Sequence, residues 1–253
     1  MLELIRTRLI LERHLPPPPG VVLDVGGGPG IYAAWLAATG YEVEIIDIVP
    51  RHIREATEKG IRATLGDARD LPTPDQSCDA VLLLGPLYHL TDHADRVQAL
   101  REARRVAKPG APVFGAAIAR FASALDGLDS GYIDDPAFVE IMNTALDFGT
   151  HSNPTQYPGY FTTAFFHRPD DLRDEMVEAG FHRVSVLAVE GIGWADRDLE
   201  RRLDDPSRLH LLLDLLARLE SEQTILGASP HLLAIGWAHQ LGAEDEKPGK
   251  HAG

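Results

Sequence analysis

The residues whose types and spacing best suit chemistry are an acid and a group of glycines near the start of the chain. Asp24 lies near the end of an apolar run, and the chain then enters a turn that contains Gly26, Gly27, Gly28 and Gly30. Because glycine has no Cβ, backbone N–H groups in such a turn approach a ligand closely, and positive φ angles cost little. A buried strand, a glycine turn and a helix start in this order are typical of a nucleotide or nucleoside site.

The spacing of the glycines distinguishes between classes of nucleotide. A dinucleotide-binding turn reads Gly-x-Gly-x-x-Gly, and its third glycine would fall at Ile31. The Gly-Lys-Ser/Thr of a phosphate loop is also missing. The carboxylate of Asp24 would repel a pyrophosphate but suits a ligand that carries an amine. At this motif the chain resembles the class I S-adenosylmethionine (SAM) dependent methyltransferases, from about Val21 to Ile118 and more loosely from Arg168 to Trp237.

Two further acids follow strand patterns at the intervals that this resemblance requires. Asp47 lies about 20 residues beyond the glycine turn, where a carboxylate accepts hydrogen bonds from both hydroxyls of a ribose. A dehydrogenase carries the same acid, so an NAD(P)-dependent Rossmann oxidoreductase stays an alternative. Gly66, Asp67 and Ala68 follow the third strand pattern. In the resembled family, this segment binds adenine through a carboxylate and the next backbone N–H.

The resemblance therefore implies SAM as the cofactor and S-adenosylhomocysteine as its product. It places Asp24 and the glycines on the methionine portion, Asp47 on the ribose, and Asp67 with Ala68 on adenine, with Ile48 as a further cofactor contact. At the end of the fourth strand, where the family binds the amino group of SAM, lie Leu84 and Gly85.

Tyr88 and His89 follow this strand end and are the candidate catalytic residues, since small-molecule members of the family often have an aromatic residue or histidine facing the methyl group. The reaction is an in-line displacement, for which alignment and desolvation do most of the work, and His89 is a candidate general base. His89 and His93 also lie four residues apart with Asp92 between them, a combination of residues that metal sites use. Asp92, however, has the features of a helix N-cap that leaves His89 outside the helix, so we expect no metal site.

Aromatic residues become dense between Ala119 and His167, where the alternation of strands and helices is lost. An insertion at this point follows the fifth strand and is placed to cover the ligand-binding edge of the sheet. We therefore expect a helical and aromatic cap over residues 119–167. Polar or aromatic groups in and beyond the cap are candidate substrate contacts in addition to Tyr88 and His89: Arg120, His151, Tyr160, Glu190 and Trp194.

Composition limits the compartment and the partners. Lys and Arg number 24 against 38 Asp and Glu, a net charge of -14, which argues against nucleic acid and anionic membrane partners. The single cysteine, Cys78, excludes an internal disulfide and fits a reducing compartment. The chain has no signal-peptide pattern, and no apolar run approaches the roughly 20 residues of a membrane span. We therefore expect a cytoplasmic protein, monomeric or homodimeric.

The 253 residues, 44% of them hydrophobic, suffice for one α/β domain. The fold that the resemblance implies is Rossmann-like: a seven-stranded sheet between helices, parallel except for its last strand. We place this domain at residues 1–242, with an N-terminal helix and proline linker at 1–19, a helical insertion at 191–228 and a disordered tail at 243–253.

The function expected from these features is methyl transfer from SAM to a nitrogen, oxygen or carbon atom of a small molecule, with secondary metabolism as one setting. The acceptor and its atom are left open. Besides the oxidoreductase, against which the missing third glycine counts, a non-catalytic SAM-binding partner subunit is an alternative. The intact glycine turn and the three acids, Asp24, Asp47 and Asp67, argue against a subunit that has lost its catalytic activity.

Overall fold

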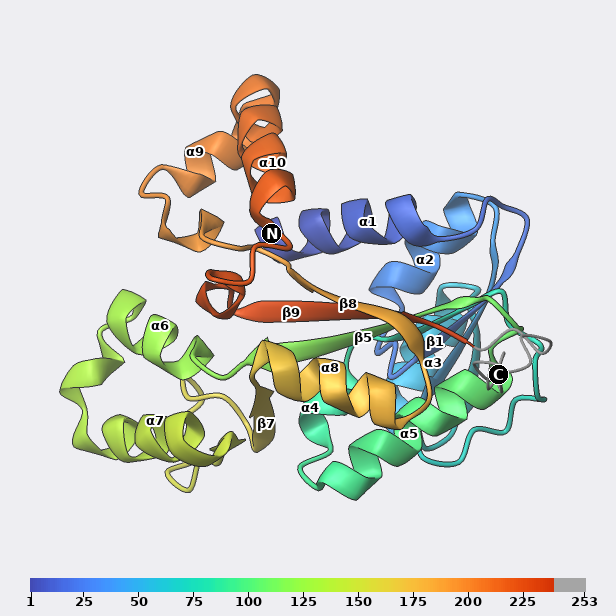
Figure 1. Cartoon of the computed structure of the whole chain (residues 1–253), viewed down its shortest axis with the longest axis horizontal. Helices are drawn as coiled ribbons and strands as arrows, with labels where there is room; N and C mark the ends of the chain where they lie inside the picture. The colour runs from blue at the N-terminus through green and yellow to red at the C-terminus, as the bar shows by residue number, and fades with distance from the viewer. Residues whose placement is uncertain (239–253) are drawn as a thin grey trace, which may run out of the picture.

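A mixed sheet organises the chain, and a computed structural model describes it over residues 1–238 (Figure 1). The strands of the main sheet lie in the order β3-β2-β1-β4-β5-β9-β8, and all are parallel except β9. This arrangement confirms the expected seven-stranded sheet. Its strands are β1 (Val21–Val25), β2 (Glu42–Asp47), β3 (Arg62–Leu65), β4 (Ala80–Leu83), β5 (Pro112–Ala119), β8 (His182–Ala188) and β9 (His231–Trp237).

Two short strands extend this sheet and were not expected from the sequence. β7 (Ala164–His167) pairs in parallel with the end of β5, beyond the last residues that pair β4 with β5. β6 (Thr150–His151) pairs antiparallel with β7. Such short segments carry too few residues for an alternating pattern to be recognised.

Helices cover both faces of the main sheet, because successive strand residues point to opposite sides. Val22, Ile45 and Phe114 face one side with helices α1, α2 and α3, whereas Leu23, Val81 and Val113 face the other with α5 and α8. These helices are α1 (Leu2–His14), α2 (Ile31–Ala38), α3 (Pro50–Glu58), α5 (His93–Val106) and α8 (Pro169–Glu178). The short helix α4 (Pro86–His89) lies between β4 and α5.

Two helical segments project from this framework. The cap, residues 120–163, contains α6 (Ala122–Asp129), the 3-10 turn η1 (Tyr132–Asp134) and α7 (Pro136–Phe148), and forms the lobe at the left of Figure 1. Phe138, Ile141 and Tyr160 belong to a small core inside the cap. The second segment lies between β8 and β9 and contains η2 (Gly193–Ala195), α9 (Leu199–Asp204), α10 (Pro206–Leu219) and η3 (Leu226–Ala228). Leu212 and Leu216 of α10 pack on Leu2 of α1.

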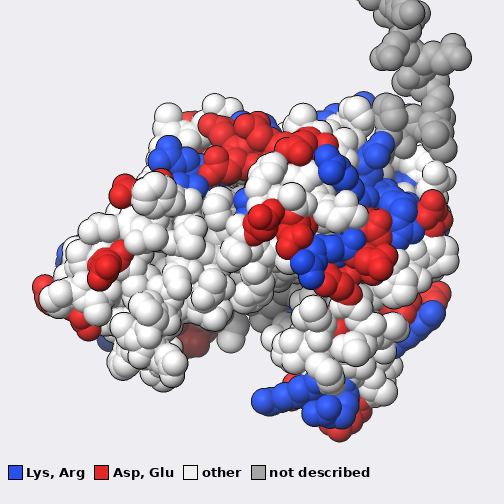
Figure 2. All heavy atoms as spheres, turned by 90° about the horizontal axis from the view of Figure 1, so that it is seen from below, with Lys and Arg blue, Asp and Glu red and all other residues white. Residues whose placement is uncertain are grey.

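The surface view from below shows acidic and basic side chains interspersed over the core, and fewer charged side chains on the face of the cap that is seen at the left (Figure 2). Within residues 1–238, no helix is both long and apolar enough to cross a bilayer. The tail expected at 243–253, and the domain end expected at 242, lie outside the described residues.

Candidate active site

The glycine turn joins β1 to α2 and needs glycine for two separate reasons. Gly26 and Gly28 have φ angles of 68° and 57°, a region that side chains with a Cβ rarely adopt. A Cβ on Gly26 would also lie 2.7 Å from the ring of Pro86, whereas one on Gly28 would meet no atom within 4 Å. The turn is thus closely packed at Gly26 and open at Gly28, where the backbone faces a cavity.

Asp24 lies beneath this turn, fully buried. Neither of its carboxylate oxygens has a hydrogen-bond partner within the described part of the chain. Burial, together with the negative charge of Asp47, raises the pKa of Asp24 to about 7. A Cβ on Gly27 would lie 2.6 Å from Oδ2 of Asp24, so the carboxyl group packs directly against the turn backbone.

Asp47 links the turn to the end of β2. Its Oδ2 accepts from the backbone N–H of Gly28 at 2.9 Å, and its Oδ1 accepts from the N–H of Val49 at 2.8 Å. Oδ1 also lies 3.1 Å from Nδ1 of His52. Three of the about four acceptor positions of a carboxylate are therefore in use. A ribose that bonds through both hydroxyls would have to displace His52.

The first cavity, of about 460 Å³, opens beside this turn at the carboxyl ends of β1, β2 and β4. Ligand sites of open α/β sheets lie at this edge. Of the expected cofactor residues, Asp24, Gly27 and Gly30 do not line the cavity, and Leu84 lines a different one. Those that do line it are Gly26, Gly28, Asp47, Ile48, Asp67, Ala68 and Gly85.

Asp67 is held by an arginine that the sequence did not single out. The backbone N–H of Arg69 donates to Oδ1 of Asp67 at 2.9 Å, and its guanidinium donates to Oδ2 at 2.6 Å. The side-chain hydrogen bond lowers the pKa of Asp67, with burial opposing. The guanidinium of Arg69 also donates to the carboxylate of Asp95 on α5, so the loop after β3 is fixed to that helix.

The second cavity, of about 250 Å³, shares Tyr88 with the first. Its walls come from the ends of β4, β5 and β9, from α1 and α2, and from Phe161 of the cap. The residues that line it are Glu3, Thr7, Tyr32, Leu84, Tyr88, Ala116, Ile118, Phe161, Val189, His231 and Leu233. The two cavities are therefore neighbours, with one aromatic side chain in the wall of both.

His89 lies at the first cavity beside Tyr88, and its exposed ring stacks on Phe161 with centroids 6.5 Å apart. Partial desolvation lowers the pKa of His89, although the negative charge of Asp47 acts in the opposite direction. Asp92 caps α5 by accepting from the N–H of Ala94, and His89 belongs to α4 instead. His89 and His93 therefore do not share a helix.

The structure does not bring the other expected substrate contacts to these cavities. Arg120 is buried and donates to the carbonyl of Phe166 and to Asp171. His151 is buried beside the hydroxyl of Ser123. The hydroxyl of Tyr160 donates to Asp135 within the cap, and Nε1 of Trp194 donates to the carbonyl of Ala228.

A histidine, His231, lines the second cavity and has the buried carboxylate of Glu190 as its partner; of the two, the sequence indicated only Glu190. Nδ1 of His231 lies 2.6 Å from Oε1 of Glu190. Burial alone would raise the pKa of Glu190 and lower that of His231. The hydrogen bond between them outweighs burial, so the pKa of Glu190 is lowered and that of His231 is raised. The pair is separated by 41 residues, so local spacing carries no signal for it. His231 also begins β9 at the end of β5, which is the one topological feature that points to it.

Comparisons with known proteins agree with this geometry. Residues 23–114 match a family described as a methyltransferase domain. Over 185 residues the chain is 32% identical to the ubiquinone/menaquinone biosynthesis C-methyltransferase UbiE of Acidiphilium cryptum, with 70% of this chain and 72% of that protein covered. A stretch of 77 residues is 39% identical to trans-aconitate 2-methyltransferase of Mycobacterium tuberculosis, with 29% of each protein covered.

A solved structure supports the same fold. The SAM-dependent methyltransferase of Methanosarcina mazei gives a TM-score of 0.62 at 17% identity, with 91% of this chain and 97% of that one covered. The fold and the glycine turn are those of a class I methyltransferase. The chain belongs to the SAM-dependent methyltransferase family and is an enzyme of that family. This membership removes the basis for the oxidoreductase alternative.

Proposed function

We propose that the protein binds SAM in the first cavity and transfers its methyl group to a small acceptor in the second. The observation that carries this proposal is the shared wall: Tyr88 lines both cavities at the carboxyl edge of the sheet. A donor and an acceptor in neighbouring cavities need only a short path between them, and alignment is the main requirement of an in-line displacement.

The residues of the first cavity fit a cationic nucleoside ligand. The turn backbone can be approached closely because Gly26 and Gly28 lack side chains, and Asp47 and Asp67 supply carboxylates along the cavity. The unpartnered carboxyl group of Asp24 has a pKa of about 7, and its ionised form favours positive rather than negative charge above the turn. SAM supplies a methyl group activated by its positively charged sulfur.

Each of these residues has a specific role in the proposal. Asp47 accepts from the ribose, and Asp67 with the backbone of Ala68 contacts adenine. Gly26 and Gly28 let the turn backbone approach the methionine portion. Tyr88 and His89 shield the reacting groups from water, since they lie beside Phe161 of the cap.

The names of the relatives do not agree on one acceptor, so the acceptor class is argued from the second cavity. Glu3 lies at that cavity, and among its described lining residues none is Lys or Arg. An acceptor with several negative charges, such as trans-aconitate, would be repelled there. The small volume and the apolar wall favour a compact, largely apolar acceptor instead.

Calorimetric titration with S-adenosylhomocysteine, and in parallel with NADH, tests the proposal without knowledge of the acceptor. We expect binding of S-adenosylhomocysteine and none of NADH. Asp129→Ala, at an exposed end of α6, serves as a control that leaves the affinity unchanged. A folded protein that binds neither ligand would refute the proposal.

A further inference from the structure

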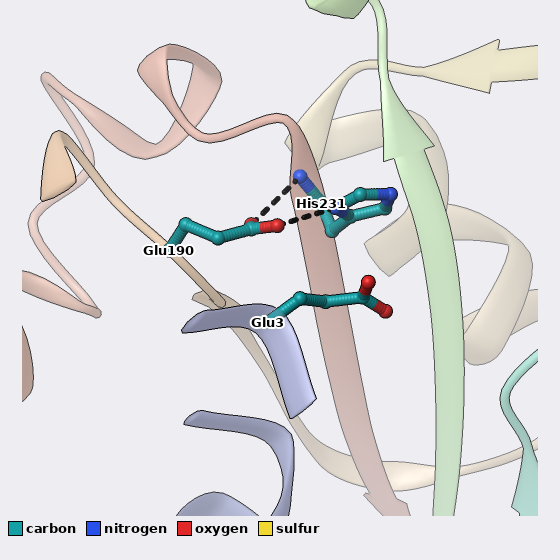
Figure 3. A group of neighbouring side chains, drawn as sticks. All are labelled: Glu3, Glu190 and His231. Atoms are coloured by element: carbon teal, nitrogen blue, oxygen red, sulfur yellow. Dashed lines mark hydrogen bonds and ion pairs between the residues drawn. The ribbon is translucent and has the colours of Figure 1, made fainter. Parts of the chain in front are cut away.

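Three ionisable side chains lie together at one side of the second cavity: Glu3 and His231 line it, and Glu190 is buried beside His231. Glu190 follows β8, His231 begins β9, and Glu3 lies in the first turn of α1. Figure 3 shows the three side chains together, and one ligand-type atom from each lies within 4.8 Å of the others. His231 pairs with Ile118 near the end of β5, so the group lies at the ligand-binding edge of the sheet.

Hydrogen bonds to Glu190 fix the orientation of His231. Oε1 of Glu190 accepts from Nδ1 at 2.6 Å, and Oε2 accepts from the backbone N–H of His231 and the hydroxyl of Ser229, each at 3.2 Å. Because an ionised carboxylate only accepts, the proton of the neutral ring lies on Nδ1. Nε2 then keeps a free lone pair, and no described residue donates to it. A histidine held in this way is poised to accept a proton from a molecule in the cavity.

We infer that His231 is the general base of the methyl transfer and that Glu190 is its positioning residue, an inference that rests on the proposed function. The acceptor is a compact, uncharged or cationic molecule with an apolar body and one O–H or N–H group. As that bond to hydrogen breaks, Nε2 takes the proton. The electron pair of the oxygen or nitrogen forms the new bond to the methyl carbon, and the pair of the broken S–C bond stays on sulfur.

The cavity supports this acceptor class. Leu84, Ile118 and Phe161 contribute apolar wall, whereas Glu3, Thr7 and His231 contribute polar groups. The cavity therefore offers apolar contacts to the body of an acceptor and polar contacts to its one protic group. The side chain of His231 is 35% exposed, so the proton that it takes has a route to solvent.

The same side chains resemble a metal-ligand set, but their hydrogen bonds favour the base. Both oxygens of Glu190 already accept bonds from Ser229 or His231. A cation bound by all three residues would displace the bond to Nδ1 and compete with the others. Turnover that requires a divalent cation, and that a chelator abolishes, would overturn the inference.

The charges around His231 define its titration. Glu190 acts on it from the loop after β8 and Glu3 from α1, whereas Tyr32 of α2 and Tyr88 of α4 only line the same cavity. Burial raises the pKa of Tyr32 to about 12 and also raises that of Tyr88, so both phenols are neutral near pH 7. The negative charge that favours the protonated ring therefore comes from Glu190 first and from Glu3 second.

Imidazole NMR of the full chain, saturated with S-adenosylhomocysteine, tests the pair without turnover. We expect His231 to show the Nδ1–H tautomer above its pKa, and Glu190→Gln to lower that pKa by about one unit. Glu178→Gln, at an exposed residue of α8 that pairs with His93, is the matched control and should leave His231 unchanged. An Nε2–H tautomer, or a titration that Glu190→Gln does not move, would overturn the inference.

Probe molecules test the acceptor class in the same experiment. We expect 4-methylphenol and 4-methylbenzylamine to shift the Nε2 resonance of His231 saturably, and 4-methylbenzoate to leave it unchanged. With the responding probe and SAM, His231→Gln should slow methyl transfer about 100-fold or more, with S-adenosylhomocysteine affinity within about twofold. Unchanged turnover in this variant, or no response to either protic probe, would contradict the inference. Failure of the wild type to bind S-adenosylhomocysteine would instead refute the proposed function.

Discussion

The backbone N–H of Gly28 donates to Oδ2 of Asp47 across 2.9 Å, which ties the turn after β1 to the end of β2. The second oxygen of Asp47 accepts from the N–H of Val49 and so fixes the start of α3 as well. The edge of the first cavity is therefore organised by the protein itself. The same carboxylate that would bind the ribose also holds the backbone beside it.

Asp47→Ala should weaken S-adenosylhomocysteine binding by about 1–3 kcal/mol, because charge-assisted hydrogen bonds are lost and the turn loses its anchor. Calorimetry with the variant measures this change, and Asp129→Ala is the control. Unchanged affinity in Asp47→Ala would remove Asp47 from the site.

Alanine at two glycines of the turn should have unequal effects. Gly28→Ala meets open space and costs about 1–2 kcal/mol of folding stability through its positive φ alone. Gly26→Ala carries the same backbone strain, and its Cβ would also clash with Pro86, which adds about 1–3 kcal/mol of overpacking. Urea denaturation of both variants gives the comparison. Equal losses of folding stability in the two variants would mean that the ring of Pro86 moves aside without an energetic penalty.

Arg96→Met should destabilise the fold by about 3–5 kcal/mol, because it leaves Glu175 buried without its main partner. Arg96 and Glu175 are 2% and 4% exposed, and their closest nitrogen and oxygen are 2.7 Å apart. Arg96 also donates to the carbonyls of Leu90 and Thr91, so it fixes the loop that follows Tyr88 and His89.

Arg101→Met provides the matched control on the same helix. Arg101 and its partner Glu178 are about half exposed, with 3.5 Å between their charged atoms. Exposed pairs of this kind contribute little, so this variant should stay within about 0.5 kcal/mol of the wild type. If both variants lose the same stability, burial does not decide the effect at Arg96.

Local patterns in the sequence predicted the elements that depend on contacts between residues close together in the chain. The apolar runs at β1 and β4 and the glycine turn are of this kind, as is the N-cap residue Asp92, whose side chain accepts from the backbone N–H of Ala94.

Contacts between segments that are distant in the chain could not be predicted from local patterns. The pairing of Glu190 with His231 depends on how β8 and β9 meet, and Glu3 joins them only through the packing of α1. Arg120 was expected to face a ligand because it is a polar residue in an aromatic segment. Its guanidinium instead satisfies a backbone carbonyl and Asp171 at the junction of β5 and β7. Sequence pattern identifies an unusual polar residue but not its partner.

The buried carboxyl group of Asp24 makes folding stability depend on pH. Its pKa rises from 3.8 to about 7, chiefly through burial, with the charge of Asp47 second. Between these values the folded chain keeps a proton that the unfolded chain has lost. The folded state thus binds more protons, and the free energy of unfolding falls as pH rises through this range. Below it, the contribution of the protonated group is fully present.

Asp24→Asn keeps the size of the side chain but cannot ionise, so it should lack this dependence. Relative to the variant, the wild type should lose up to about 4 kcal/mol of unfolding free energy between about pH 4 and pH 7. Urea denaturation across that range measures the difference, and Asp129→Asn should follow the wild type. Any cost of burying an amide without partners is independent of pH, so the slope carries the test. A constant difference between Asp24→Asn and the wild type would mean that Asp24 is ionised beneath the turn.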